Sequence, residues 1–283
     1  MFTVLERISW PGSKDRPNED ACGSAGAWAW VIDTSIFPGT PSVMHPESDA
    51  AWLAAFANAR FAALAPDAED GPTLARRVME EARDAFFAVA PEERRDSLTW
   101  PLGALTLVRG RDGTLDVWSF ADTTAYLRRP DGTVLTLGEA PELRIAESAA
   151  AADLLRQAGC TPKEIVSTPV FRRWLAERRN RQKQESGMAL LALEPDAAAM
   201  MRPERVAMPE GSAVLLCSDG FSALVDLYRA FDAKALMEAA LATGLQPLAA
   251  AARRIEAEED PRGVRYPRFK TSDDATALLL QWN

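Results

Sequence analysis

Seven acidic residues occupy positions from which a carboxylate could bind a cation. Asp33 ends the apolar run WVI, Asp219 follows AVLLCS, and Asp122 interrupts VWSFADTTAYL. The pair Asp273–Asp274 directly precedes ATALLL, and Glu19–Asp20 lies in a short loop near the amino terminus. Apolar strands bury their middles, so residues at their ends line the rim of a sheet, where an unpaired carboxylate is costly. Each residue alone is typical of a turn, but together they favour one shared site.

The donor atoms available decide which cation such a site would bind. The chain has one histidine, His45, and three isolated cysteines, Cys22, Cys160 and Cys217. This excludes a HExxH zinc site, and the cysteine spacing matches no metal motif. Carboxylate oxygens suit hard cations such as Mg²⁺, Mn²⁺ or Ca²⁺. Two such ions can activate a water molecule and hold a phosphoryl group for in-line attack.

The loop SKDRPNEDACG, residues 13–23, also places two cations beside the acidic pair. Lys14 and Arg16 precede Glu19–Asp20 by a few residues. The proline and glycine of this stretch are typical of a solvated surface loop.

The elements that must position these residues follow from hydrophobic periodicity. Residues 27–32, AWAWVI, predict a buried strand that ends at Asp33. Strand-like runs separated by RDG and PDG turns fill 103–137, and further strands are predicted at SAVLLCS and ATALLL. Helices are predicted at 50–65 and 73–89. Residues 146–184 are also predicted as helical, with a stop at Gly159 and new starts at 161–162 and 168–169, and so are residues 233–258, with an interruption near Gly244 and Pro247. This order indicates a mixed α+β fold with an antiparallel meander, not an alternating βαβ pattern.

One helical segment is strongly basic. FRRWLAERRNRQK, residues 171–183, carries six basic residues and one acidic residue. Two interpretations remain open: a solvated helix face, or a basic flap beside a site for anionic substrates.

Composition narrows the class of protein. The chain has 283 residues, 26% of them charged, and a net charge of −9, which argues against wrapping of nucleic acid. It has no apolar run long enough to span a bilayer and no secretory pattern, and its isolated cysteines favour a reducing cytoplasm. It also lacks GxGxxG, GxxxxGK[ST] and GxSxG motifs. We therefore expect a cytoplasmic protein with no nucleic-acid or membrane partner, and the oligomeric state is left open.

Five short motifs resemble those of the PP2C-type (PPM) metal-dependent serine/threonine protein phosphatases, in the same order and at similar spacing. They are RPNEDA, VIDTS, FADTTAYL, LLCSDGF and SDDATALLL, and the resemblance runs from about residue 8 to the end of the chain. It implies two antiparallel β-sheets in a sandwich flanked by helices, in α-β-β-α layers. It also implies a single phosphatase domain, 1–283, of a divergent bacterial member, with a helical flap-like insertion at about 141–186.

The resemblance implies a role for each matching residue. Asp33 would bridge two Mn²⁺ or Mg²⁺ ions, Glu19 and the carbonyl of Thr34 would bind the second ion, and Asp219 and Asp273 would bind the first. Asp20 would hydrogen-bond water at the metal pair. Asp122, with Asp219, would support a third, weaker ion, as in bacterial members. The implied reaction is hydrolysis of phosphoserine or phosphothreonine in a phosphoprotein substrate, with no phosphoenzyme.

Several positions depart from the family pattern, including Asp274, which stands where the family has an asparagine, and 121–124, ADTT, which stands for its G-D-S-R. Thr34 replaces the glycine that follows the bridging aspartate, and Ser35 stands where some members have a histidine proposed as general acid. His45 is an alternative proton donor that the sequence does not place near the site. The family's phosphate-binding arginine corresponds to Asp15, so Arg16 would take its role from one residue away.

Two other functions remain to be weighed against an active phosphatase. The departures at Thr34 and Arg16 would also suit a catalytically weak or inactive module that keeps the fold and serves in binding or regulation. A haloacid-dehalogenase-type phosphatase is disfavoured, because Ser35 stands where its first motif needs a second aspartate. That class also requires a parallel sheet built from alternating helices and strands, which this sequence lacks.

Overall fold

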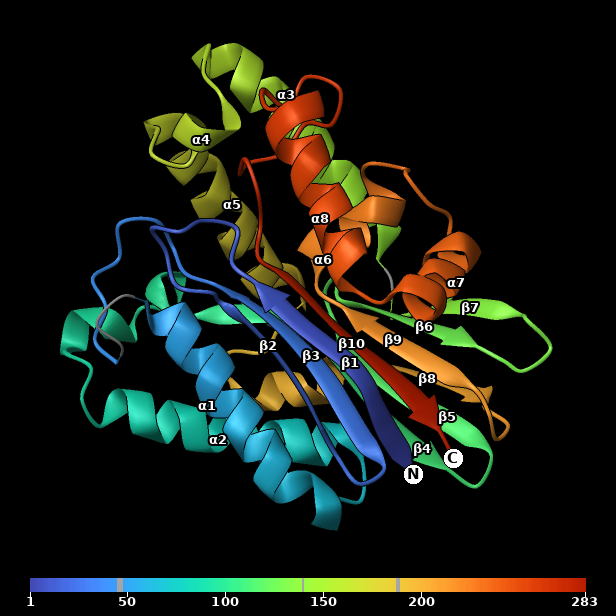
Figure 1. The fold of residues 1–283 in the computed structure, drawn as a ribbon. Coiled ribbons are helices and arrows are strands. Elements are labelled where there is room, and N and C mark those ends of the chain that lie inside the picture. Colours follow the sequence, from blue (N-terminus) through green and yellow to red (C-terminus); the bar gives the residue numbers. More distant parts are fainter. Residues whose placement is uncertain (45–47, 139, 187–188) are drawn as a thin grey trace.

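Two five-stranded antiparallel sheets pack face to face in the computed structural model, which describes residues 1–44, 48–138, 140–186 and 189–283 (Figure 1). The first sheet has the order β1 (Phe2–Trp10), β10 (Ala275–Trp282), β9 (Ala213–Cys217), β6 (Thr124–Arg128) and β7 (Val134–Leu137). The second has the order β2 (Asp20–Ala25), β3 (Trp28–Ser35), β4 (Leu102–Arg111), β5 (Thr114–Phe120) and β8 (Arg202–Ala207).

Alternation along the strands builds the core between the sheets. Val31 of β3 and Val117 of β5 meet Leu216 of β9 and Leu278 of β10 in one buried cluster. The opposite faces of the same strands are buried under helices; Trp30 and Ile32, for example, pack beneath the first two helices. Because the central strands are covered on both faces, their sequences read as continuous apolar runs.

Helices cover both outer faces, which gives the α-β-β-α layers predicted from the sequence. α1 (Asp49–Leu64) and α2 (Gly71–Phe87) cover the second sheet, and α6 (Asp219–Asp226), α7 (Ala233–Thr243) and α8 (Gln246–Arg254) cover the first. Short 3₁₀ turns lie at Ala65–Asp67, Glu92–Arg95, Ser97–Thr99 and Pro195–Met200, and a π-helical turn at Ile255–Glu259 continues α8.

Three further helices stand over one end of the sandwich, at the top of Figure 1. They are α3 (Pro141–Ala158), α4 (Pro162–Ile165) and α5 (Pro169–Ser186), and they share a small core that includes Leu155, Ile165, Phe171 and Phe269. This is the region where the sequence predicts a flap-like insertion. The assignment of 1–283 to a single domain stays a prediction.

The predicted breaks within 146–184 are confirmed, since Gly159 adopts a left-handed conformation at the end of α3 and prolines open α4 and α5. Other elements differ from the sequence-based expectation. Strand β8 escaped prediction because its residues are mostly exposed and do not alternate. Asp219 is the first residue of α6, not a turn residue. None of the helices in the described ranges is long and apolar enough to cross a membrane.

Candidate functional site

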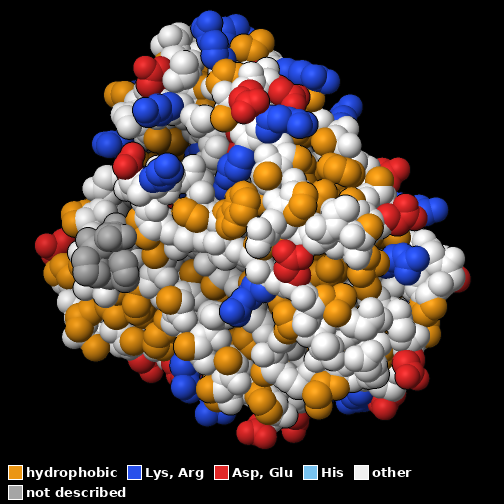
Figure 2. All heavy atoms as spheres, in the orientation of Figure 1, with side chains coloured by type: hydrophobic (Ala, Val, Ile, Leu, Met, Phe, Trp, Pro, Cys, Tyr) orange, Lys and Arg blue, Asp and Glu red, His pale blue; other side chains and the backbone are white. Residues whose placement is uncertain are grey.

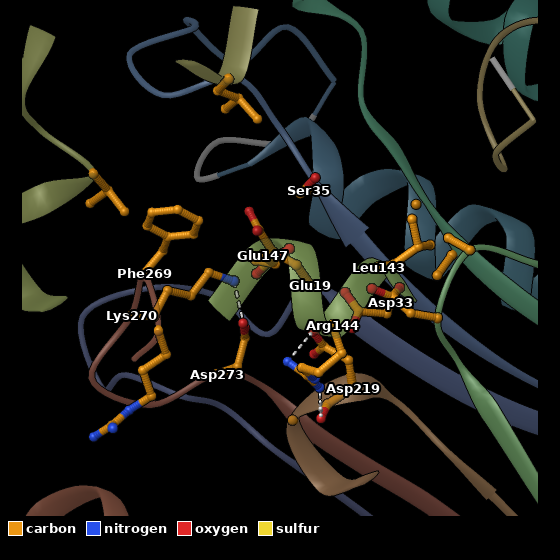
Figure 3. A pocket seen from close by; sticks show the side chains of 18 of the residues that line it. Glu19, Asp33, Ser35, Leu143, Arg144, Glu147, Asp219, Phe269, Lys270 and Asp273 are labelled. Carbon is orange, nitrogen blue, oxygen red and sulfur yellow. Dashed lines mark hydrogen bonds and ion pairs between the residues drawn. The ribbon is translucent and has the colours of Figure 1, made fainter. Parts of the chain in front are cut away.

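A cleft of about 260 Å³ opens at the end of the sandwich, between the strand ends and helices α3 and α5 (Figure 3). The acidic residues that line it are Glu19, Asp33, Asp122, Glu147, Asp219, Glu256 and Asp273. Five of these were predicted as site residues, and Arg16 lines the same cleft. Arg16 and Asp273, separated by 257 positions, therefore reach one site because both sheets present their strand ends to it.

Asp33 and Asp20 are paired directly across β2 and β3. Asp33 lines the cleft, whereas Asp20 does not; Asp20 is buried, and its Oδ2 atom has no hydrogen-bond partner among the described residues. Burial, followed by repulsion from Asp20 and Asp219, raises the pKa of Asp33 well above its usual value. Burial and the charge of Asp274 act in the same way on the pKa of Asp20. The two carboxyl groups thus form an electrostatically unfavourable pair that a bound cation would stabilise.

Glu19 is held from both sides before β2 begins. Its backbone N–H donates to Asp274 Oδ2 at 2.7 Å, and Ser48 Oγ donates to its carboxylate. Ser48 is also the N-cap of α1, so the helix start and the acidic side chain are positioned together. Burial raises the pKa of Glu19, although Ser48 and the charges of Lys270 and Arg16 act in the opposite direction.

The side chain of Thr34 is directed away from the cleft. Its Oγ1 atom lies within hydrogen-bonding distance of the carbonyl oxygens of Glu19 and Ala50, and its N–H donates to the Glu19 carbonyl at 3.0 Å. The threonine that departs from the family's glycine therefore links β3 to the start of α1. That the backbone carbonyl of Thr34 binds a metal ion stays a prediction.

Asp219 begins α6 and forms an ion pair with Arg144 of α3. Arg144 Nη1 lies 3.4 Å from Asp219 Oδ2, and Arg144 Nη2 donates to the Asp219 carbonyl at 2.8 Å. Arg144 also pairs with Asp226 at the other end of the same helix, at 3.1 Å. Burial raises the pKa of Asp219 to about 7 despite the opposing charge of Arg144, and its Oδ1 atom is buried without a partner.

Asp273 and Asp274 point to different sides of the segment before β10. Asp273 lines the cleft and accepts a hydrogen bond from Lys270 Nζ (Figure 3). Burial favours the neutral form of Asp273, but Lys270 outweighs it and the pKa is lowered. Asp274 instead accepts hydrogen bonds from the N–H groups of Gly12 and Glu19, each at 2.7 Å. Asp274 is therefore a positioning residue that ties the amino-terminal loop to β10.

The interaction of Asp274 with the loop gives a first prediction. Asp274→Ala should lower the free energy of unfolding by about 1–3 kcal/mol, because two partly buried N–H groups lose their acceptor. It should also weaken Mn²⁺ binding, since the backbone of Glu19 is released. Urea unfolding and calorimetric titration with Mn²⁺ measure the two effects, with Asp131→Ala in an exposed turn as the control. Equal stability of wild type and Asp274→Ala would contradict this role.

Asp122 lies in the turn between β5 and β6, next to Ala121, which has a positive φ of 56°. Burial and the charge of Glu147 raise the pKa of Asp122, while Arg144 and Arg178 oppose this. Asp122 thus belongs to a mixed cluster of charges on the α3 side of the cleft. Its role as the ligand of a third ion stays a prediction.

Two cationic residues of the loop before β2 are exposed. Arg16 lines the cleft and Lys14 does not, and no carboxylate of the described residues lies within ion-pairing distance of Arg16. Ser35, at the family's histidine position, lines the cleft. His45 lies outside the described residues.

The residues that would hold divalent cations fit them in chemistry. Within the described ranges, no three side chains of Asp, Glu, His or Cys are already gathered closely enough to hold an ion. However, the donors are hard oxygens, and Asp20 Oδ2 and Asp219 Oδ1 are buried without partners. Lys270 and Arg144 pair with Asp273 and Asp219, so a bound ion would compete with these two cations for the same carboxylates.

Sequence reasoning missed Lys270 and Arg144, which line the cleft. Arg178 and Arg179 also line it; they belong to the basic segment 171–183, for which the sequence left two interpretations open. Lys270 could have been noticed because it precedes Asp273 by three residues. Although burial alone would lower the pKa of Lys270, the charges of Asp273 and Asp33 raise it well above its usual value. Arg144 lies 75 positions from Asp219, and no local pattern connects them.

Comparison with solved structures places the fold among serine/threonine phosphatases of the PPM type. The chain is 15% identical to PppA, a key regulatory component of T6SS in Pseudomonas aeruginosa, over 100% of this chain and 98% of that one, with a TM-score of 0.56. It is 15% identical to the catalytic domain of the serine/threonine phosphatase PstP in complex with two manganese ions, over 99% and 97% of the chains, with a TM-score of 0.52. The PPM Ser-Thr phosphatase MsPP from Mycobacterium smegmatis, in complex with cacodylate, is 19% identical over 99% and 100% of the chains, with a TM-score of 0.50.

These similarities confirm the fold inferred from the five motifs. At sequence identities of 15–19%, these similarities show the fold and nothing more. No family model matches this chain, and no curated protein sequence matches it either.

Proposed function

We propose that this chain is a metal-dependent phosphatase that hydrolyses phosphoserine or phosphothreonine in proteins. One observation carries the proposal: Glu19, Asp33, Asp219 and Asp273, which come from four separate parts of the chain, line one cleft at the strand ends. Their donor set suits Mn²⁺ or Mg²⁺. The fold shared with a manganese-bound phosphatase supports the same reading.

In this proposal the residues would hold two ions. Asp33 would be shared between them, Glu19 and the Thr34 carbonyl would bind one, and Asp219 and Asp273 would bind the other. Asp122 and Asp219 would be available to a third ion. When bound, the ions would supply an activated water and offset the charge of the phosphate.

The other residues hold the substrate and its water. Asp20, which is paired with Asp33 across the two strands, orients water by hydrogen bonding. Arg16, in the loop before β2, binds the phosphate. The apolar side chains of α5 on the opposite wall exclude bulk water from the cleft. No residue of the chain needs to be phosphorylated.

A second candidate is a binding or regulatory module that keeps the fold without catalysis. The observation that favours it is the occupation of two carboxylates by the chain's own cations, Lys270 on Asp273 and Arg144 on Asp219. The name of PppA, with which the fold is shared, describes a regulatory component. The two candidate functions differ in whether the protein hydrolyses a phosphate ester.

Hydrolysis assays separate the two candidates. The purified chain is incubated with 4-nitrophenyl phosphate and with a phosphothreonine peptide, across a titration of Mn²⁺ or Mg²⁺ and in EDTA. A phosphatase gives saturable, metal-dependent release of phosphate that Asp219→Asn greatly reduces. An absence of turnover in the parent protein at every metal concentration would leave only the binding module.

The assignment of Arg16 gives a further prediction. Arg16→Ala should raise KM for a phosphate ester by about tenfold and change kcat less, since a charge-assisted hydrogen bond contributes about 1.5–3 kcal/mol. Lys14→Ala is the matched control, because Lys14 is exposed on the same loop and does not line the cleft. An unchanged KM in Arg16→Ala would mean that another cation of the cleft binds the phosphate.

A further inference from the structure

Arg179 is a buried cation in the wall of the cleft. Only 5% of the residue is exposed, although it lines the cleft. Its Nη1 atom donates to the carbonyl oxygens of Leu98, at 2.8 Å, and Trp100, at 3.3 Å. Its guanidinium carbon lies 5.8 Å from the centre of the Phe37 ring. These contacts fix the side chain in place without neutralising it.

Arg179 has no carboxylate partner among the described residues, and its Nε and Nη2 atoms have no hydrogen-bond acceptor there. The neighbouring arginines differ: Arg178 pairs with Glu147 at 2.9 Å, and the buried Arg94 pairs with Asp49 at 2.8 Å. Burial and the charge of Arg178 lower the pKa of Arg179 to about 10. It stays charged at neutral pH, and a buried charge without a counterion is costly. An incoming anion would remove that cost.

Arg179 lies on a wall of the cleft that is formed by apolar and polar side chains of α5. The residues of α5 that line the cleft follow helical spacing on one face: Phe171, Trp174, Leu175, Arg178, Arg179 and Gln182. Other basic residues of the helix, such as Arg173, are exposed elsewhere. Figure 2 shows several Lys and Arg side chains over the region of α3 to α5, among Asp and Glu. Of the two interpretations of this basic segment, the cleft-facing positions of Arg178 and Arg179 favour the basic flap.

We infer that Arg179 binds an acidic group next to the phosphorylated residue of a polypeptide substrate. The inference rests on the proposed function and names the class of substrate: a phosphopolypeptide with a carboxylate or a second phosphate beside the reacting one. The cleft has acidic residues at its strand ends and, on its helical wall, a guanidinium with no carboxylate partner among the described residues, so these two parts of the cleft suit different groups of one ligand. The apolar side chains of α5 that line the same cleft suit the intervening peptide. Because the chain carries a net charge of −9, a local cation is needed to attract an acidic segment.

The test measures binding, so that it does not depend on turnover. Three fluorescent peptides each carry a non-hydrolysable phosphonate in place of phosphoserine, flanked by alanine, by glutamate or by a second phosphonate. Their Kd values for the Mn²⁺-loaded protein are measured by fluorescence anisotropy. Wild type should bind at least one acidic peptide about tenfold more tightly than the alanine peptide, as expected for a charge-assisted arginine contact. The glutamate and phosphonate arms tell the two kinds of acidic group apart.

Two variants on α5 locate the effect. Arg179→Gln should reduce the preference to less than about twofold, whereas the exposed Arg173→Gln should retain it. Thermal unfolding checks that Arg179→Gln is folded. If it is not, Arg179→Lys, which keeps the charge but loses the planar fork, should fold and retain only part of the preference.

The outcomes separate this inference from the proposed function. Equal binding of all three peptides by wild type, or a preference that survives in Arg179→Gln, would overturn the inference even if the protein hydrolyses phosphate esters. An Arg179-dependent preference in a protein without turnover would uphold the subsite and reject catalysis.

Discussion

Asp33→Asn should reduce Mn²⁺-dependent hydrolysis of a phosphate ester by at least about 100-fold, because it removes the carboxylate that bridges both ions in the proposed site. Asp33 lies opposite Asp20 on the neighbouring strand and is surrounded by other acids, and burial and their charges raise its pKa well above its usual value. An amide has the same shape but no charge, so its oxygen coordinates a divalent cation only weakly. The loss should appear in kcat and in the apparent affinity for Mn²⁺.

A matched variant shows that the effect is local. Asp112→Asn makes the same chemical change in the exposed turn between β4 and β5, where the side chain is 86% exposed. It should have wild-type activity. The same substitution at position 33 should also raise the melting temperature of the metal-free protein, since it removes one of several mutually repelling charges. Retention of more than about half of the activity by Asp33→Asn would refute the bridging role.

Asp49→Ala should lower the free energy of unfolding by about 3–5 kcal/mol, the cost of leaving a buried partner charge uncompensated. Asp49 is fully buried at the start of α1 and pairs with Arg94, whose side chain also donates to the carbonyl of Thr99. Its Oδ1 atom accepts from the N–H groups of Val43 and Met44, each at 2.8 Å. One carboxylate therefore fixes the loop before α1, the helix itself and the segment around Arg94.

The same effect depends on pH in a defined direction. Burial alone would raise the pKa of Asp49, but the hydrogen bonds from Met44 and Val43 outweigh it, so the pKa is lowered on folding. The stabilisation is therefore present above about pH 3.9, the pKa in an unfolded chain, and is lost as pH falls through the lower folded-state value. The difference in unfolding free energy between wild type and Asp49→Ala should shrink over that range.

Urea unfolding at several pH values measures both quantities. Asp84→Ala is the control, because Asp84 pairs with Arg83 on the surface with 72% of its side chain exposed. Its cost should stay below about 1 kcal/mol. A cost for Asp49→Ala no larger than that of the control would show that the buried pair does not stabilise the fold.

Strand periodicity predicted the frame of the site well. Strands bury their middles, so the acids that end apolar runs, such as Asp33 and Asp219, were expected at the sheet rim, and they line the cleft. The family resemblance named Asp273, and not Asp274, as a metal ligand, but strand periodicity could not separate the two residues, because both precede the same strand. The long-range hydrogen bonds of Asp274 to Gly12 and Glu19 distinguish them.

Which basic residues line the site could not be predicted from local sequence patterns, for a different reason. Arg144 and Arg179 belong to helices whose position over the sandwich depends on how α3 and α5 pack, not on their own periodicity. The sequence showed that 171–183 is basic, but not which residues face the cleft. Arg179 became distinctive only once its burial and its lack of a counterion among the described residues were known.

Diffraction from crystals soaked in Mn²⁺, collected at a wavelength where manganese scatters anomalously, tests most directly whether these acids hold a metal pair. The proposal predicts two anomalous peaks in the cleft, roughly 3.5–4 Å apart, with Asp33 between them and Asp219 and Asp273 beside one of them. Lys270 should then have moved its amino group away from Asp273. An occupied manganese site elsewhere with no peak in this cleft, or a cleft in which Lys270 and Arg144 keep their ion pairs at saturating Mn²⁺, would contradict it.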